Sequence, residues 1–225
     1  MSDDCVLLID DGRLAALTLA AIQPTGTRFV VIEPNGTHPA QSRRSAMVQR
    51  HLDQLDLVTH ELLPPPPAQI TGPAYRLLDA YTLVLAAGAA RTHGVSRILC
   101  PFHVGHDVEA IGEVVRQIDA LTDLIRDCGS NDETGPSAGP PEGPSAGPAA
   151  GDVLIDVPLV DLTEADVIKL ADDCDVPLDA FWPCEHGEPV PCGQCASCRT
   201  WREAFQSFGL PWPWPRQAAL HAQPS

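Results

Sequence analysis

Four cysteines near the carboxyl end have the residue type and the spacing of a metal centre: Cys184, Cys192, Cys195 and Cys198. The last three form an overlapping CxxCxxC, and the glycines and prolines around them allow tight turns that point several sulfurs inward. Four thiolates complete the tetrahedral shell of one zinc ion. Because all four ligands would come from the protein and leave no open position for water, the pattern indicates one structural zinc ion.

The same cysteines allow other interpretations. An iron–sulfur cluster uses the same ligand chemistry, although no proline follows the last cysteine. Disulfides are a second alternative, but CxxC loops bridge poorly and nothing else in the chain indicates secretion. The third is a chance collection of free cysteines. His186 lies inside the loop and could replace one sulfur, although a solvated loop histidine is the simpler interpretation.

The composition limits the classes of protein to which the chain can belong. Its 225 residues can bury one sizeable core, or one core and a small appendage. Fourteen Lys and Arg against 30 Asp and Glu give a net charge of −16, which disfavours general nucleic-acid or anionic-membrane binding but allows a small anion in a locally basic pocket. The apolar runs are too short for a transmembrane helix, and the acidic start lacks the basic region of a signal peptide. We therefore expect a soluble, cytoplasmic protein.

Apolar runs and helical patterns alternate along the first 128 residues. Strands are expected at 5–9, 28–33, 57–63 and 95–100, and helices at 13–22, 39–55, 75–93 and 106–127. Alternation of this kind, with near-continuous apolar strands, is typical of a parallel sheet covered by helices on both faces. The sequence therefore predicts an α/β protein whose Rossmann-like domain spans residues 1–128.

Three further segments are expected after this domain. Residues 129–151 are rich in Gly, Pro, Ser and Ala, and GPSAGP occurs twice within them, at 135–140 and 143–148. Such a composition cannot bury enough apolar surface to order itself, so we predict a disordered insertion without chemistry. Residues 152–211 hold the last strand, expected within 153–160, then a helix and the zinc-binding helical module with its four cysteines. Residues 212–225 form a tail rich in Trp and Pro.

Two local patterns refine this C-terminal part. Thr163 is an expected N-cap, and Asp166 stands three residues later at the capping-box position. Trp212 and Trp214, set between prolines, could pack on the core or anchor a partner. Packing on the core is the favoured interpretation.

Residues 157–211 resemble 7-cyano-7-deazaguanine synthase, the amide- and nitrile-forming ligase of the queuosine and archaeosine pathway. The resemblance covers about a quarter of the chain and implies a Rossmann-like sheet of the adenine-nucleotide α-hydrolase type over the remainder. The matching positions are Pro158-Leu159, Cys184, Cys192-Gly193-Gln194-Cys195, Cys198, Arg202, Ala204-Phe205 and Gly209.

The nucleotide loop of that family is changed in this chain. The family carries SGGxDS after its first strand, and the backbone N–H groups of this loop hold the ATP pyrophosphate. Here Gly12 is kept, whereas Asp10-Asp11 replace the Ser-Gly opening and Leu14-Ala15 replace the Asp-Ser pair. Two carboxylates repel phosphate unless a metal ion such as Mg²⁺ lies between them. The resemblance assigns nucleotide binding to Asp10, Asp11, Gly12 and Arg76, the last in place of an Arg-Asn pair.

The substrate loop after the fourth strand also differs from the family. A tyrosine-proline-aspartate motif is replaced by a segment with His103, His106 and Asp107, which are candidate substrate contacts at the carboxyl end of a parallel strand. An HxxHD pattern could hold zinc or supply a general base, although ordinary loop polarity is the simpler interpretation. The lysine usual in the helix after Pro-Leu is Glu164 here. The polar residues nearest to the family's turn after the second strand are Gly36, His38 and Arg43.

The resemblance implies an ATP-dependent C–N ligase that activates 7-carboxy-7-deazaguanine as an adenylate. Ammonia then displaces AMP, and a second activation dehydrates the amide to the nitrile. A divergent synthase-like enzyme is therefore one hypothesis, with ATP and Mg²⁺ as cofactors and no catalytic residue assigned. The alternative is a non-catalytic, zinc-stapled relative that binds a deazapurine or a protein partner. The expected partners are a deazapurine or nucleotide and, in a homodimer, a second copy, but neither nucleic acid in general nor a membrane.

Overall fold

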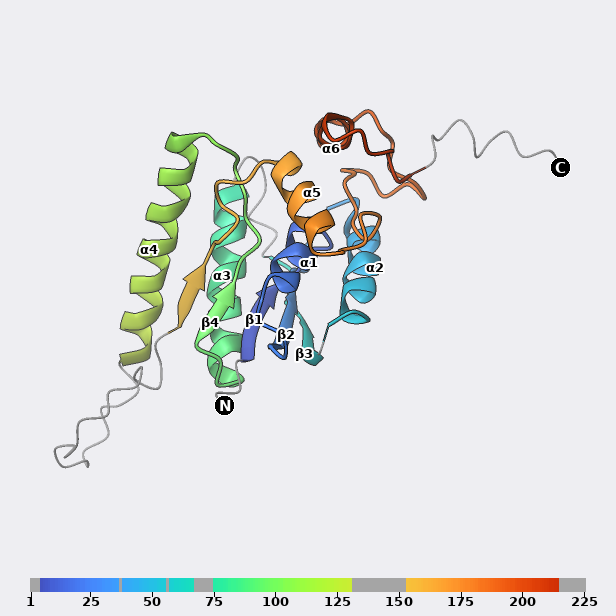
Figure 1. The fold of residues 1–225 in the computed structure, drawn as a ribbon. Coiled ribbons are helices and arrows are strands. Elements are labelled where there is room, and N and C mark those ends of the chain that lie inside the picture. The colour runs from blue at the N-terminus through green and yellow to red at the C-terminus, as the bar shows by residue number, and fades with distance from the viewer. Residues whose placement is uncertain (1–4, 37, 56, 67–74, 131–152, 215–225) are drawn as a thin grey trace, which may run out of the picture.

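The computed structural model describes residues 5–36, 38–55, 57–66, 75–130 and 153–214 (Figure 1). The first two residues of the predicted insertion, 129 and 130, are instead the end of α4, and the rest of the insertion and most of the predicted tail lie outside the described residues. The elements are β1 (Cys5–Ile9), α1 (Leu14–Ala21), β2 (Arg28–Glu33), α2 (Gln41–Leu52), β3 (Leu57–Leu62), α3 (Tyr75–Thr92), β4 (Arg97–Leu99), α4 (Val108–Ser130), β5 (Leu154–Asp156), α5 (Glu164–Asp173) and α6 (Ala196–Ser207).

The strands form one parallel sheet in the order β3-β2-β1-β4-β5. The predicted parallel α/β class is confirmed. The chain leaves the β3 edge and returns beside β1 as β4, so the strand order reverses between β1 and β4. Ligands of open α/β sheets bind outside the carboxyl ends of the strands at such a reversal. The loops after β1 and β4 are therefore the first places to search for a site.

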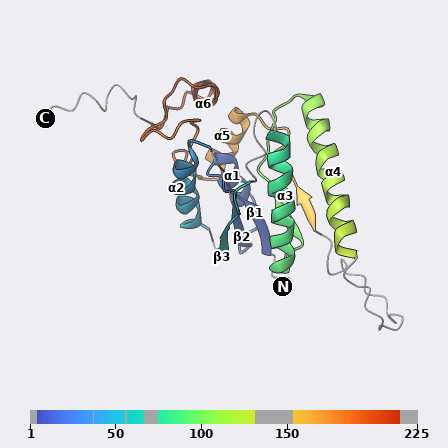
Figure 2. The same cartoon turned by 180° about the vertical axis from the view of Figure 1, so that it is seen from behind.

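Successive side chains of each strand point to opposite faces of the sheet, and each face buries its own core. Leu8 and Val31 face the core that α1, α2, α5 and α6 cover, whereas Leu7 and Ile32 face α3 and α4. Figure 1 shows α1, α2 and α5 on the near face, and Figure 2 shows α3 in front when the molecule is seen from behind. Helix α1 is buried at seven of its eight residues because it lies between the sheet and α5.

The last strand is shorter than the sequence indicates. β5 ends at Asp156, because residues 158–161 form a turn in which Val160 N–H donates to the Val157 carbonyl (3.1 Å). Pro158 lacks an N–H group and so cannot extend the ladder. β5 still completes the sheet beside β4, so the C-terminal segment is part of the main fold.

The aromatic residues near the carboxyl end pack on the core, as predicted. The ring of Trp214 lies 4.8 Å from that of Phe181, and the ring of Trp212 lies 5.8 Å from that of Phe205. Phe181 and Phe205 are fully buried, so the two tryptophans cover the outer side of the core between α5 and α6.

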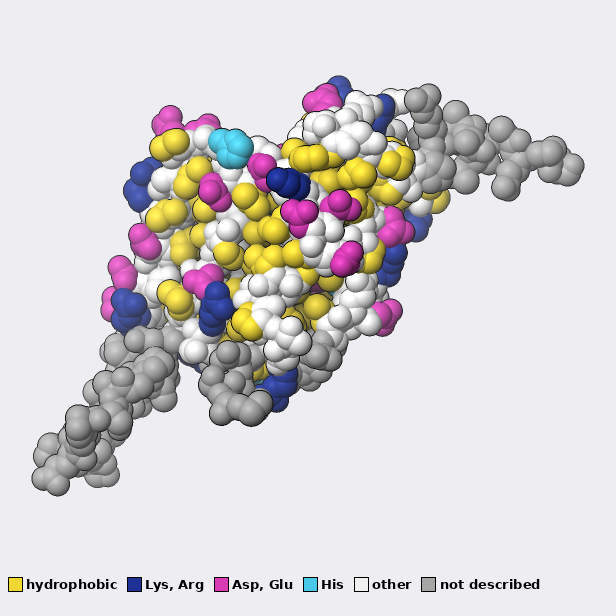
Figure 3. All heavy atoms as spheres, viewed as in Figure 1, with side chains coloured by type: hydrophobic (Ala, Val, Ile, Leu, Met, Phe, Trp, Pro, Cys, Tyr) yellow, Lys and Arg dark blue, Asp and Glu magenta, His cyan; other side chains and the backbone are white. Residues whose placement is uncertain are grey.

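On the face shown in Figure 3, acidic side chains are interspersed with apolar ones and the basic side chains stand singly. This distribution agrees with the net charge of −16. Within the described part of the chain, no helix is both long enough and apolar enough to span a lipid bilayer.

The capping box of α5 is confirmed and can be tested. The Thr163 hydroxyl accepts from Asp166 N–H (3.2 Å), and Asp166 Oδ2 accepts from Thr163 N–H (2.9 Å). We expect Thr163→Ala to lower the free energy of unfolding by about 1 kcal/mol in urea titrations. Thr200→Ala on the exposed face of α6 is the control and is expected to change it by less than about 0.5 kcal/mol. Equal effects of the two variants would contradict this account.

Candidate functional site

The four predicted cysteine ligands converge on one point. Their sulfur atoms all lie within 4.8 Å of one another, and those of Cys192 and Cys198 are 4.0 Å apart. A tetrahedral zinc centre with zinc–sulfur bonds of about 2.3 Å places its sulfurs about 3.8 Å apart. Cys184 and Cys198 are fully buried, whereas Cys192 and Cys195 are half-buried. The cluster could therefore hold one metal ion, and zinc as its identity stays a prediction.

Backbone N–H groups point at these sulfurs and favour the thiolate form that a metal ion requires. His186 and Cys192 each donate to Cys184 Sγ (3.4 Å), and Gln194 and Cys195 donate to Cys192 Sγ (3.4 and 3.3 Å). Burial opposes ionisation of Cys192, but the N–H groups of Gln194 and Cys195 outweigh it and lower its pKa to about 7. For Cys184, burial dominates and raises the pKa. A bound cation would offset this cost.

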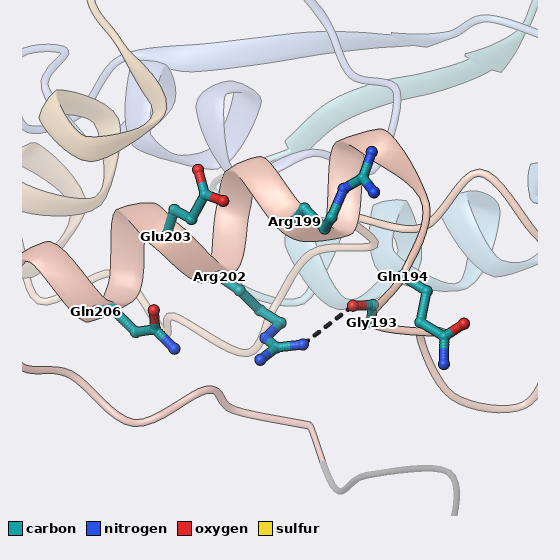
Figure 4. Close-up of a pocket in the computed structure, with 6 residues that line it drawn as sticks. All are labelled: Gly193, Gln194, Arg199, Arg202, Glu203 and Gln206. Atoms are coloured by element: carbon teal, nitrogen blue, oxygen red, sulfur yellow. Dashed lines mark hydrogen bonds between the residues drawn. The ribbon is translucent and has the colours of Figure 1, made fainter.

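Helix α6 begins inside the cysteine cluster. Cys195 is the N-cap, and its sulfur accepts from Cys198 N–H in the first turn (3.4 Å). Arg202, one turn further, donates to the Gly193 carbonyl (3.1 Å), which ties the helix to the CxxC turn (Figure 4). Figure 4 shows an open polar groove at this place, lined by Gly193, Gln194, Arg199, Arg202, Glu203 and Gln206.

Helix α2 fixes the cysteine module to the sheet through charge. It carries three arginines and no acidic residue, in a strongly acidic chain. Arg50 pairs with Asp179 (3.2 Å), and the Arg43 guanidinium lies 5.8 Å from the ring centroid of Trp182. Both partners belong to the segment that leads into Cys184. The basic helix and this segment therefore hold the cysteine cluster against the carboxyl edge of the sheet.

Asp10, at the carboxyl end of β1, and His51, on α2, form a buried hydrogen-bonded pair. Both side chains have an exposed fraction of 0%, and His51 Nδ1 donates to Asp10 Oδ2 (2.7 Å). The other carboxylate oxygen of Asp10 accepts from Gly12 N–H (2.9 Å), and His51 Nε2 donates to the Ala180 carbonyl (2.5 Å). Both oxygens of Asp10 are thus used within the protein. This burial leaves neither oxygen open to a nucleotide or to Mg²⁺.

Both ring nitrogens of His51 face oxygen atoms that accept hydrogen bonds, which favours its protonated form. Burial by itself lowers its pKa, but the hydrogen bonds to Asp10 and Ala180 and the charge of Asp10 raise it above the ordinary value of 6.5. A neutral ring would direct one lone pair at an oxygen atom. His51 falls within the helix expected at 39–55, but no local pattern of the sequence identifies Asp10 as its partner.

The turn after β1 is closed on both sides by the protein. Gly12 has φ +74°, and a Cβ atom there would lie 2.3 Å from the Arg44 carbonyl oxygen, so only glycine fits. Its carbonyl accepts from Trp182 N–H (3.0 Å). Asp11 pairs with Arg13 (3.0 Å). Asp11 Oδ1 and Arg44 Nε are buried and have no hydrogen-bond partner among the described residues.

His103, in the loop after β4, lies where the strand order reverses between β1 and β4. It packs edge-on against Trp201, with ring centroids 6.3 Å apart. Burial lowers the pKa of His103. The charge of Arg13 lowers it too, whereas the charges of Glu164 and Asp11 raise it. The structure therefore brings together Asp11 and His103, which the sequence assigned to two different loops, and adds Arg13 and Glu164 to them.

The other predicted loop contacts lie elsewhere. Asp107 Oδ1 accepts from the N–H groups of Glu109 and Ala110 and so caps α4 (2.9 and 3.1 Å). His106 is mostly exposed and pairs with Asp166 (3.2 Å). The HxxHD pattern therefore does not converge on one point. Arg76 stands in the first turn of α3, and its side chain lies outside the described part of the structure.

Sequence reasoning missed a polar cluster at the carboxyl end of β2. Glu33 has an exposed fraction of 4%; the Ser45 hydroxyl donates to its Oε1, and His60 Nε2 lies 3.2 Å from its Oε2. A charged residue that ends a buried apolar strand is the signal that could have identified Glu33. Its partners come from α2 and β3, which no local pattern links to it.

The fold and site define a parallel α/β protein with a four-cysteine module at the carboxyl end. Residues 144–209 match the family described as Queuosine biosynthesis protein QueC. Over 51 residues the chain is 47% identical to 7-cyano-7-deazaguanine synthase from Prochlorococcus marinus (strain AS9601), which is 23% of each chain. The enzyme of the same name from Persephonella marina is 37% identical over 62 residues, or 28% of this chain and 27% of that one.

The resemblance predicted from the cysteine module is therefore confirmed over this C-terminal segment, where the chain is similar to 7-cyano-7-deazaguanine synthases. The match spans about a quarter of the length of these curated relatives. The structure of NMN synthetase from Francisella tularensis matches with a TM-score of 0.38 at 18% identity and covers 97% of this chain and 81% of that one.

Metal content tests the cysteine cluster. We expect the purified protein to contain about one zinc ion per chain by plasma mass spectrometry and Cys195→Ser to lose most of it, because three thiolates hold zinc more weakly. A chelator is expected to lower the melting temperature of the wild type, because metal binding stabilises the folded protein. Cys174→Ser, which changes a cysteine outside the cluster, is the control and should keep its metal. Wild-type protein that lacks any transition metal would refute this expectation.

The stabilisation from His51 is expected to depend on pH. Since its pKa is raised in the folded protein, this stabilisation is fully present below 6.5 and is lost as pH rises through the raised value. We expect His51→Ala to cost about 3 kcal/mol near pH 6, because it leaves Asp10 buried without its partner. The difference from the wild type should shrink towards about pH 9 in urea titrations. A difference that is constant or grows over this range would contradict a protonated His51.

Proposed function

We propose that this protein is a divergent 7-cyano-7-deazaguanine synthase-like protein that keeps a zinc-stapled scaffold and binds a deazapurine without ATP-dependent chemistry. The single observation that carries the proposal is the closure of the turn after β1. Gly12 N–H donates to Asp10, and the Gly12 carbonyl accepts from Trp182. A turn that holds pyrophosphate needs free N–H groups, and here protein atoms use the one at Gly12.

The charge beside this turn supports the same conclusion. The Asp11 carboxylate lies next to the start of α1, where a helix N-terminus would otherwise attract phosphate. Its pair with Arg13 neutralises that arginine as a phosphate ligand. Several phosphate groups would have to approach a carboxylate at this place, which is unfavourable without a cation.

The thiolate set supports zinc as the bound metal. Four sulfur donors in a closed shell suit zinc and leave no coordination position for a substrate. Zinc would therefore stabilise the module and take no part in a reaction. The module would in turn hold Trp182 and Ala180 against the turn after β1 and the buried His51.

An ATP- and Mg²⁺-dependent C–N ligase is the second candidate function. The observation that favours it is Asp11 Oδ1, a buried acceptor without a partner among the described residues. A carboxylate oxygen of this kind could bind Mg²⁺, and Arg13 and Arg44 nearby could then contact a phosphate. This alternative requires the Asp11–Arg13 pair to open.

Nucleotide turnover separates the two candidates. We expect saturable heat on titration with 7-carboxy-7-deazaguanine and no heat with ATP and Mg²⁺, because the turn after β1 has no free N–H at Gly12. We also expect no AMP when ATP, Mg²⁺, ammonia and the deazapurine are combined. A metal-free Cys195→Ser preparation is the control for specific binding. ATP-dependent AMP formation by the wild type would contradict the proposal and establish the C–N ligase as the function.

A further inference from the structure

We propose that the cysteine cluster is also a redox switch, in which a peroxide joins Cys192 to Cys198 as a disulfide, expels the metal ion and loosens the turn after β1. The inference goes beyond the proposed function, because it concerns regulation and holds for any ligand of the protein. It requires the zinc ion predicted at the cluster. Three observations carry it, namely the unequal burial of the cysteines, the distance between two sulfurs, and the contacts that join the cluster to Gly12.

The cysteines of the cluster are buried unequally. Cys198 is fully buried, whereas Cys192 is half-buried. Gly193 and Gln194, which directly follow Cys192, line the open polar groove (Figure 4). A small oxidant dissolved in water therefore reaches the cluster most easily at Cys192. Because oxidation follows the exposure and the thiolate character of a sulfur, Cys192 is the expected first target.

Cys198 can complete the reaction that begins at Cys192. Its sulfur lies 4.0 Å from that of Cys192, and a disulfide needs about 2 Å. Cys192 lies in the loop before α6 and Cys198 in the first turn of that helix, so a small movement of the loop brings the two sulfurs together. Cys195 is a poorer partner for Cys192, because a CxxC loop bridges poorly.

The reaction balances with one molecule of hydrogen peroxide. The Cys192 thiolate attacks one oxygen, the O–O bond breaks, and a sulfenic acid forms as hydroxide leaves. The Cys198 thiolate then attacks the sulfur of Cys192 and displaces a second hydroxide. Two thiolates are oxidised to one disulfide, and the peroxide takes up two protons and is reduced to two water molecules. Cys184 and Cys195 then remain as the only thiolate ligands, which are too few to retain zinc.

The cluster is joined to the turn after β1 through the segment that precedes it. Trp182 belongs to the same small buried core as Cys198, and its N–H donates to the Gly12 carbonyl (3.0 Å). Gly187, inside the cysteine loop, lies against the start of α2, since a Cβ atom there would be 2.4 Å from the Pro39 carbonyl oxygen. Loss of the metal ion would loosen this loop and therefore the Trp182 contact that closes the turn.

Peroxide-driven zinc release tests the switch. Zinc-loaded protein is treated with hydrogen peroxide, and a chromogenic chelator reports the free ion. We expect about one zinc ion per chain to leave as two thiols disappear, and peptide mapping to find a disulfide between Cys192 and Cys198. Dithiothreitol with added zinc should restore the loaded form. Loss of the thiols without zinc release, or a disulfide between other cysteines, would overturn the inference.

Two variants with histidine in place of one cysteine make the test specific for the pair. Cys192→His and Cys195→His each keep three thiolates and add an imidazole, a ligand set that also holds zinc. We expect Cys192→His to slow the release about tenfold or more, because it cannot form the disulfide, and Cys195→His to stay within about threefold of the wild type. Equal rates in the two variants would contradict the pair. If either variant fails to load with zinc, the peptide map of the wild type decides.

Hydrogen exchange measures whether the switch reaches the turn after β1. We expect the Trp182 amide to exchange faster after oxidation and to return to its original rate after reduction with zinc, because its bond to Gly12 is loosened without the metal ion. The amide of Ile98 in the central strand β4 is the control and should keep its rate. Unchanged exchange at Trp182 would refute the link to the turn. None of these measurements involves a deazapurine, so their failure would leave the proposed function standing.

Discussion

The buried pair of His51 and Asp10 is the interaction on which the rest of the structure depends. His51 joins the carboxylate of Asp10, at the end of β1, to the carbonyl of Ala180, just before the cysteine module. Because both side chains are fully buried, neither charge can be solvated if the other is lost. The His51 side chain thus connects the sheet, α2 and the segment that leads to the cysteine cluster.

This connection gives the turn after β1 a different use from that of a nucleotide loop. The Asp10 carboxylate accepts a hydrogen bond from Gly12 N–H, and Trp182 N–H donates to the Gly12 carbonyl, so the turn is held at both of its peptide groups. The closed turn and the thiolate cluster are consequently parts of one rigid edge. A metal ion at the cysteines would stabilise this edge without facing a ligand, which agrees with a closed coordination shell.

The distribution of charge follows the same arrangement. Acidic groups are spread over the face shown in Figure 3, whereas α2 carries three arginines and no acidic residue. Arg43 and Arg50 contact the segment between α5 and the cysteines directly. Arg44 instead turns to the carboxyl end of β1, where its buried Nε has no partner among the described residues. Two of the three arginines therefore hold α2 against this segment.

The sequence by itself determined the parallel α/β class, the capping box of α5 and the convergence of the cysteines, because apolar periodicity and short ligand spacing are local signals. It also determined the resemblance of the C-terminal segment. Only the tertiary structure decided the use of Asp10, because its partner His51 lies 41 residues further along the chain and Ala180, the other partner of His51, lies another 129 residues on. The same holds for Glu33, whose partners Ser45 and His60 come from α2 and β3. Contacts between distant segments depend on how elements pack, which no local pattern encodes.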